Sequence, residues 1–308
     1  MTNFQCQINY QCPMTNWHFG KISVPMVSKI EPLGIGKLEI NLKLVIGYLT
    51  LACFLLCCST AAAEDWKELK GEHFIVYYLD DREFASDVMT RAEQYYNTVA
   101  SDLGYSRYDS FWQWDKRVKI YIYRTAEEFR KAAGISKEWP VGMARYKEKE
   151  IISYKWSAGF VESLLPHEIT HLVFRDFVGD KNNIPLWLEE GVAVREEEGR
   201  RPGDIELVKK LVREKSYIAI ELLTKMDIRN EPNAEAARKF YAEAVSIVNF
   251  LMEKYGVSRF TLFCRQLRDG RSIDEAISSV YTGYMGNMGD LEKRWVEYYE
   301  GEGVKWEN

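Results

Sequence analysis

Two histidines four residues apart, His167 and His171, most constrain what this chain can fold into. They lie in the segment LLPHEITHLVF, whose remaining residues are mostly apolar, so the pattern predicts a helix buried in a core. Residues four apart lie on the same face of a helix, so His167 and His171 can both reach one ion. Glu168 projects beside the two histidines. Buried imidazole and carboxylate groups need partners, and a divalent cation provides one. Pro166 either kinks this helix or begins a new one in its first turn.

A third metal ligand is expected downstream, in IPLWLEEGVAV at 184–194. Two imidazoles and one carboxylate, with a further position open, form a typical catalytic zinc set. Glu189 and Glu190 both qualify, but the eighteen-residue spacing from His171 and the adjacent Gly191, which belong to the family signature described below, favour Glu190. Glu189 then points roughly 100° away around the helix, toward solvent. One Zn²⁺ ion is the expected metal, although affinity order alone leaves cobalt, nickel and copper open.

HEITH, eighteen residues and then WLEEG form a signature that resembles the gluzincin metallopeptidases, with a site similar to the aminopeptidase-N-like branch. Over roughly residues 66–300 the chain looks more like the smaller peptidase MA-like proteins. EHFIVYY, the helix ending in LGY, the strand before TAEEF and YAEAVSIVNFLMEKYG carry this weaker likeness. The resemblance implies a zincin-like fold and zinc-dependent hydrolysis of peptide bonds.

The resemblance also implies a role for each site residue. His167, His171 and Glu190 bind the metal, and Glu168 is the general base that activates water. Tyr241 begins the segment that aligns with the transition-state-stabilising tyrosine of aminopeptidase-N-like enzymes, which donates to the oxyanion. A tyrosine beside Phe240, in a chain with 19 tyrosines, also fits an ordinary packing role.

The likeness breaks down on the strand before HEITH, where aminopeptidases of that branch carry a glutamate that captures the substrate's free amine. The strand here reads VGMARY, and Arg145 stands near that place, where a cation would repel an ammonium group. We therefore expect internal bonds to be cleaved, with the substrate added as a strand against 141–146.

The pattern of apolar residues predicts an α+β fold in which a small mixed β-sheet and an active-site helix precede a mostly helical C-terminal half. We expect one domain over 64–308, β-rich at 64–156 and helical at 157–308. His73, at the start of a strand, is expected to be structural or on the surface. The expected strands are 73–79, 117–125 and a hairpin at 141–154, and the expected helices are 82–103, 125–134, 158–178, 187–196, 203–214, 234–254, 257–268, 272–281 and 288–300.

Residues 1–63 read as an N-terminal extension with a secretory signal. Fifteen uncharged residues at 44–58 follow Lys43 and precede the small residues Ala61 to Ala63, as in a leader cleaved before Glu64. The run is short for a membrane span, but an uncleaved anchor stays open. We expect export to the periplasm or the cell exterior, with membrane contact only through a retained leader. The true start could lie at Met26 or later.

Charge and cysteine content bear on the partners of the chain. A formal net charge of −5 gives no sign of nucleic-acid binding, so the expected partner is a peptide or protein substrate. Five of six cysteines precede residue 60, so Cys264 has no partner for a disulfide in the folded part.

The alternative to an enzyme is a zincin-fold surface scaffold whose metal site does little chemistry.

Overall fold

The computed structural model describes residues 65–104, 112, 116–135, 141–155, 159–179, 184–197, 201–228 and 233–301. The elements from β1 to α11 belong to one compact unit. The apolar run at 44–58, the expected cleavage site and the expected domain boundary at residue 63 all lie outside the described residues. Among the described helices, none is both long and apolar enough to cross a membrane.

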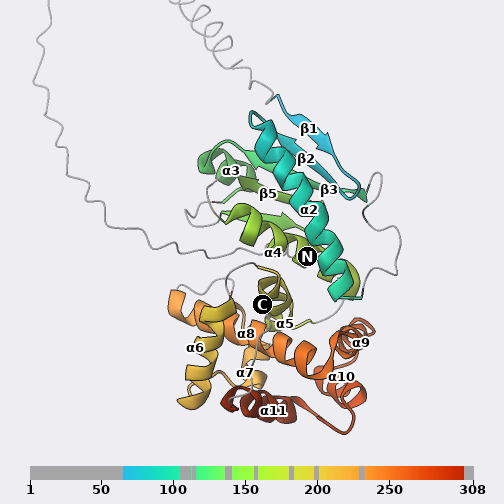
Figure 1. Ribbon diagram of the computed structural model, residues 1–308, viewed down its shortest axis with the longest axis vertical. Coiled ribbons are helices and arrows are strands. Elements are labelled where there is room, and N and C mark those ends of the chain that lie inside the picture. The colour runs from blue at the N-terminus through green and yellow to red at the C-terminus, as the bar shows by residue number, and fades with distance from the viewer. Residues whose placement is uncertain are drawn as a thin grey trace, which may run out of the picture. The chain divides into compact units, whose positions relative to one another are not determined.

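A five-stranded mixed sheet forms the first half, with the strand order β1-β2-β3-β5-β4 (Figure 1). The inner strands β2, β3 and β5 run parallel, while β1 and β4 are antiparallel to their neighbours. β4 therefore forms one edge, and within the described chain its outer side pairs with no strand. The strands are β1 (Lys67–Lys70), β2 (Phe74–Tyr78), β3 (Val118–Tyr123), β4 (Gly142–Arg145) and β5 (Glu150–Tyr154).

The two faces of the sheet bury different residues because side chains alternate along each strand. One face places Val76, Ile120 and Ala144 in the main core with residues of α2 (Arg82–Asp102) and α4 (Leu165–Val178). The other face packs Met143 against α3 (Ala126–Ala133) in a smaller cluster. α4 thus lies on the sheet beside the edge strand β4.

Helices make up the second half, drawn from yellow to red in Figure 1. The central helix is α8, which packs against α5, α6, α9 and α11. On α9, the thiol of Cys264 is fully buried, and burial raises its pKa. The helices are α5 (Leu186–Arg195), α6 (Arg201–Arg213), α7 (Ile220–Lys225), α8 (Ala234–Tyr255), α9 (Val257–Arg268), α10 (Ile273–Val280) and α11 (Met288–Glu300).

One buried carboxylate belongs to this helical half. Glu243 of α8 is fully buried, and its two oxygens accept hydrogen bonds from the backbone N–H of Ile218 at 3.1 and 3.0 Å. Burial raises the pKa of Glu243 to about 8, although the Ile218 hydrogen bond and Lys239 act in the opposite direction. The fold therefore holds a carboxyl group that favours its protonated form near neutral pH.

The α+β prediction is confirmed, and the expected strands and helices are found within a few residues of their predicted bounds. His73 is structural as expected, because its Nδ1 lies 2.7 Å from a carboxylate oxygen of Glu93. The sequence pattern missed β1 and α7. Both are short, and β1 reads KELK, a charged segment on the edge of the sheet.

Candidate metal centre

The HEITH segment sits at the start of α4, directly after a π-helical turn η2 (Phe160–Leu164). Pro166 occupies the first turn of α4, directly after the π-helical turn, so it marks the junction between the π-helical and the α-helical part of one continuous helical segment. The hydroxyl of Thr170 donates to the Pro166 carbonyl at 2.6 Å. His167, Glu168 and His171 are all buried, which confirms the expected core helix with a polar seam.

α5 brings Glu190 to the same place. It begins after Pro185, and Glu190 lies in its second turn with a fully buried side chain. The next residue, Gly191, allows α5 to approach α8 closely. A Cβ at position 191 would lie 2.5 Å from the carbonyl oxygen of Ala244 and 2.8 Å from a methyl group of Val248. Glycine is required there because a side chain would push the two helices apart.

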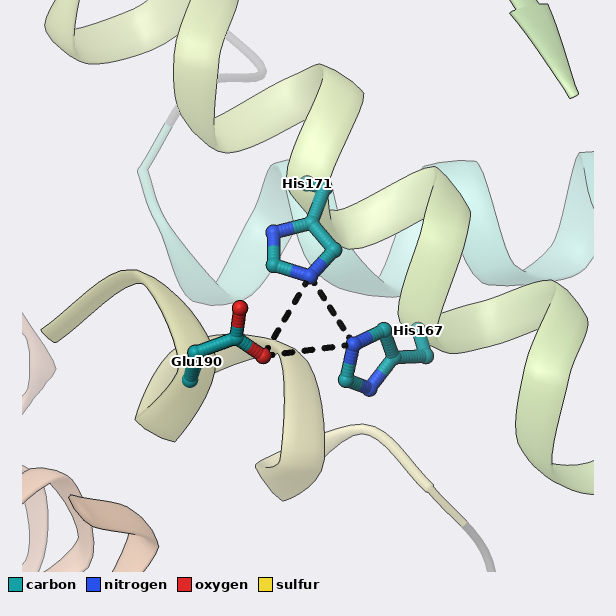
Figure 2. A group of neighbouring side chains, drawn as sticks. All are labelled: His167, His171 and Glu190. Atoms are coloured by element: carbon teal, nitrogen blue, oxygen red, sulfur yellow. Dashed lines mark hydrogen bonds and ion pairs between the residues drawn. The ribbon is translucent and has the colours of Figure 1, made fainter. Parts of the chain in front are cut away.

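Figure 2 shows His167 and His171 of α4 converging with Glu190 of α5. The two Nε2 atoms lie 2.8 Å apart, and Glu190 Oε2 lies 3.6 Å from His167 Nε2 and 3.7 Å from His171 Nε2. One ligand atom from each residue falls within 4.8 Å of the others. The structure thus brings together the three residues predicted as ligands, and their donor set matches a catalytic zinc site.

Glu168 lies outside this cluster, as expected of a base rather than a ligand. Both of its carboxylate oxygens are buried and make no hydrogen bond to a side chain that the structure describes. Burial raises the pKa of Glu168 to about 7, an effect that His167 and His171 partly oppose. The backbone of Ala144 on β4 also lowers this pKa, which places Glu168 next to the edge strand. A carboxylate with this pKa can accept a proton and release it near neutral pH.

The sequence analysis missed Glu197, which lies just beyond the end of α5. Its side chain is fully buried, its Oε1 lies 2.7 Å from His167 Nδ1, and its Oε2 accepts a hydrogen bond from the Ser163 hydroxyl at 2.9 Å. A carboxylate on Nδ1 directs the other ring nitrogen, Nε2, toward a metal. Burial lowers the pKa of His167, but Glu190 and Glu197 outweigh this and raise it to about 10.

Glu189 does not point to solvent, so that prediction was wrong. It is buried, and its carboxylate forms a two-pronged ion pair with Arg175 of α4, in which Arg175 Nε donates to Oε1 at 2.6 Å. Burial raises the pKa of Glu189, but His171 and Arg175 outweigh it and lower the value to about 2. The 100° turn from Glu190 directs Glu189 toward α4, which covers this side of α5.

The charges around the two imidazoles fit a divalent cation. Four carboxylates are buried here, those of Glu168, Glu189, Glu190 and Glu197, and Arg175 offsets one of them. Buried negative charge is costly unless it is paired. The surrounding carboxylates and the converging nitrogens therefore fit a bound cation at this point.

Tyr241 lies in the second turn of α8 and is mostly buried, with its ring edge-on to Phe240 at 5.7 Å. It stands one turn before Ala244, the residue that Gly191 approaches, so it lies toward the face of α8 that covers α5. Its catalytic role stays a prediction.

Arg145 does not line the site, which corrects the reason given for cleavage of internal bonds. Its guanidinium donates to the carbonyl of Ala132 in α3 at 2.9 Å and lies 3.5 Å from Glu150. Arg145 therefore shares the α3 face of the sheet with Met143, and the intervening Ala144 packs on the α4 side. The Arg145 guanidinium therefore lies on the opposite face of β4 from α4 and the metal-ligand candidates.

The chain matches one protein-family model, whereas a search of curated proteins finds no match to it. A family model for the Peptidase MA superfamily matches residues 107–301, well over half of the 308 residues, and spans α3 to α11 together with β3 to β5. The buried His-Glu-Ile-Thr-His helix and the glutamate that α5 delivers to it both lie inside this match, and the chain belongs to the Peptidase MA superfamily.

Proposed function

We propose that this protein is a zinc-dependent metallopeptidase that cleaves internal peptide bonds. The observation that carries the proposal is the convergence of His167, His171 and Glu190 beside Glu168, a buried carboxylate with no hydrogen bond to a described side chain. The ligand spacing resembles that of gluzincins, in particular the aminopeptidase-N-like branch. His167, His171 and Glu190 would hold the ion, which supplies a Lewis acid that makes water more acidic and polarises the scissile carbonyl.

The residues of the chain supply the proton transfers. Glu168 would accept a proton from the attacking water and deliver it to the leaving amine, since its raised pKa suits both steps. Tyr241 would donate its hydroxyl to the oxyanion of the tetrahedral intermediate. The apolar core around α4 would lower the local dielectric around Glu168, which strengthens its electrostatic interactions.

The edge strand supports a mode of cleavage. β4 can accept an extended peptide as an additional strand on its outer side. Gly142 and Ala144 lie on the face of β4 that packs toward α4, and neither carries a carboxylate that could capture a terminal ammonium. Burying an unpaired amine costs affinity, so a free N-terminus gives the substrate no advantage.

The substitution Glu168→Gln tests the proposal. Purified wild-type protein should contain one zinc ion and should cleave an unstructured protein in a manner that a chelator abolishes. The variant should keep its metal and lose about 10²–10⁴ in rate, because only the base is removed. Glu148→Gln, which alters an exposed carboxylate in the β4–β5 turn, is the matched control and should remain active. A metal-loaded wild-type protein that cleaves no peptide would favour the scaffold alternative.

The mode of cleavage has its own test. One peptide is offered with a free N-terminus and with an acetylated N-terminus, and the cut sites are mapped. Equal cleavage of both at internal bonds supports endoproteolysis. Stepwise release of single residues from the free form alone would mean that a carboxylate elsewhere captures the amine.

We also propose that the protein is exported, on the basis of the apolar run at 44–58 and the small residues after it. The mature chain should begin at Glu64. N-terminal sequencing of the exported form decides the point, since an apolar run that is still attached would mean that the leader is retained as an anchor.

A further inference from the structure

Arg175 and Glu189 form a largely buried ion pair between α4 and α5, the two helices that carry the proposed metal ligands. Arg175 Nε donates to Glu189 Oε1 at 2.6 Å, and the Nη2 atom of Arg175 also contacts Oε2. The side chains are 13% and 3% exposed, so water screens this pair little. A planar two-pronged contact fixes the orientation of the carboxylate as well as its position.

The same carboxylate faces a ligand residue. Glu189 Oε1 lies 3.4 Å from His171 Nδ1, while His171 Nε2 is the atom that joins the cluster with Glu190. A carboxylate beside Nδ1 favours the tautomer with the proton on Nδ1, which leaves the lone pair of Nε2 for a metal. His171 thereby faces a carboxylate with its Nδ1, as His167 does with Glu197, but at 3.4 Å rather than at the 2.7 Å of the His167 contact.

Tyr146 connects this pair to the edge-strand hairpin. It directly follows β4, its ring lies 5.7 Å from Arg175 Cζ, and it lies edge-on to His171 with a centroid distance of 6.3 Å. A guanidinium over an aromatic face is attracted to it. Tyr146 therefore contacts both the cation that holds Glu189 and the imidazole that Glu189 faces.

We propose that Glu189, held by Arg175, is a positioning residue for His171, and that Tyr146 couples the end of strand β4 to this arrangement. The inference rests on the proposed function, since it takes His171 as a metal ligand. The metal affinity then depends on a contact made by the hairpin against which a substrate would lie.

Metal binding tests this without any peptidase assay. Zn²⁺ is titrated into metal-free protein against a chromophoric chelator, and the Co²⁺ absorption spectrum is recorded at saturation. Glu189→Gln should weaken Zn²⁺ binding by about 10–100-fold and alter the Co²⁺ spectrum. Asp176→Asn is the matched control, because Asp176 also lies on α4 and bonds the hairpin residue Lys149 at 2.7 Å. This control should bind Zn²⁺ as the wild type does.

Two further variants keep the test decisive. Glu189→Gln removes the carboxylate that Arg175 contacts, so the double variant Arg175→Met with Glu189→Gln removes both charges and should show the same loss of affinity. Tyr146→Leu should weaken Zn²⁺ binding about two- to fivefold in the wild type, and should have no effect once Arg175 is methionine.

Three results would overturn the inference in distinguishable ways. Wild-type affinity in both variants that lack the Glu189 carboxylate would exclude the positioning role while leaving the proposed function intact. An equal loss in Asp176→Asn would mean that any loosening of α4 has this effect. A wild-type protein that binds neither Zn²⁺ nor Co²⁺ would overturn the proposed function itself, and this inference with it.

Discussion

Replacing Gly191 with alanine should destabilise the protein, even though alanine favours helices more than glycine does. The added Cβ would lie 2.5 Å from the Ala244 carbonyl oxygen and 2.8 Å from its carbonyl carbon. Both are backbone atoms of a buried helix and cannot rotate away. Relieving the contact to 3.0–3.4 Å requires α5 and α8 to separate by about 0.5–0.9 Å.

The size of the effect follows from two opposing contributions. Overpacking costs about 1–3 kcal/mol, while the gain in helix propensity returns about 0.5–1 kcal/mol. The expected net loss is about 1–2 kcal/mol, which lowers Tm by about 2–8 °C in a domain of this size. Glu190 precedes Gly191 and moves with α5, and metal sites tolerate ligand shifts of only about 0.2 Å, so metal affinity should fall as well.

Thermal unfolding in the presence of a chelator measures the packing effect separately from metal binding. Gly203→Ala is the matched control, because Gly203 lies exposed in α6 with open space around its Cβ position. This variant should gain about 0.5–1 kcal/mol, so the two Tm shifts should have opposite signs. If Gly191→Ala raises Tm as Gly203→Ala does, the close approach of α5 and α8 does not limit stability and the reasoning is refuted.

Three further substitutions have defined outcomes. Glu190→Ala should lower the metal content of purified protein, and full occupancy would remove Glu190 from the ligand set. Tyr241→Phe should reduce kcat by about 10²–10³ with the fold intact, whereas a wild-type rate would assign Tyr241 to the core. Glu243 has a raised pKa in the folded state, so the folded protein binds more protons than the unfolded chain between pH 4.5 and about 8. Its contribution should therefore lower stability as pH rises through this window, by at most about 1.4 kcal/mol per pH unit. Urea unfolding at pH 5.5, 6.5 and 7.5 should show wild type losing stability relative to Glu243→Gln as pH rises, and a constant difference would contradict the assignment.

The candidate metal ligands could be predicted from the sequence because two short motifs contain them. The i, i+4 spacing of His167 and His171 fixes their common helix face, and the apolar residues around the motif indicate burial. Glu190 could be identified because its spacing from His171 and the adjacent Gly191 match the signature that the chain resembles. The strands β2 and β3 were equally accessible, since alternating β-branched and aromatic residues mark one buried face.

The residues that surround the ligands could not be predicted in the same way. Helix geometry gives the angle between Glu189 and Glu190, but not the fact that Arg175 of another helix occupies that direction. Glu197 lies in the turn after α5. Outside a helix or strand, the spacing of apolar residues does not predict the direction of a side chain. The direction of Arg145 followed from strand alternation once the sheet order placed α3 and α4 on opposite faces. The directions of these side chains depend on contacts between segments that lie far apart in the chain, and a single sequence does not reveal such contacts.

The burial of Cys264 has a consequence for where the folded domain can exist. A thiol attacks disulfides and oxidants as its thiolate, and burial raises the pKa of Cys264 and shields its sulfur. The residue is thus protected from mixed disulfides, from covalent dimerisation and from stepwise oxidation to sulfenic acid. The covalent structure of the domain should consequently be the same in a reducing cytosol and in an oxidising exterior, so passage across a membrane requires no oxidative folding step.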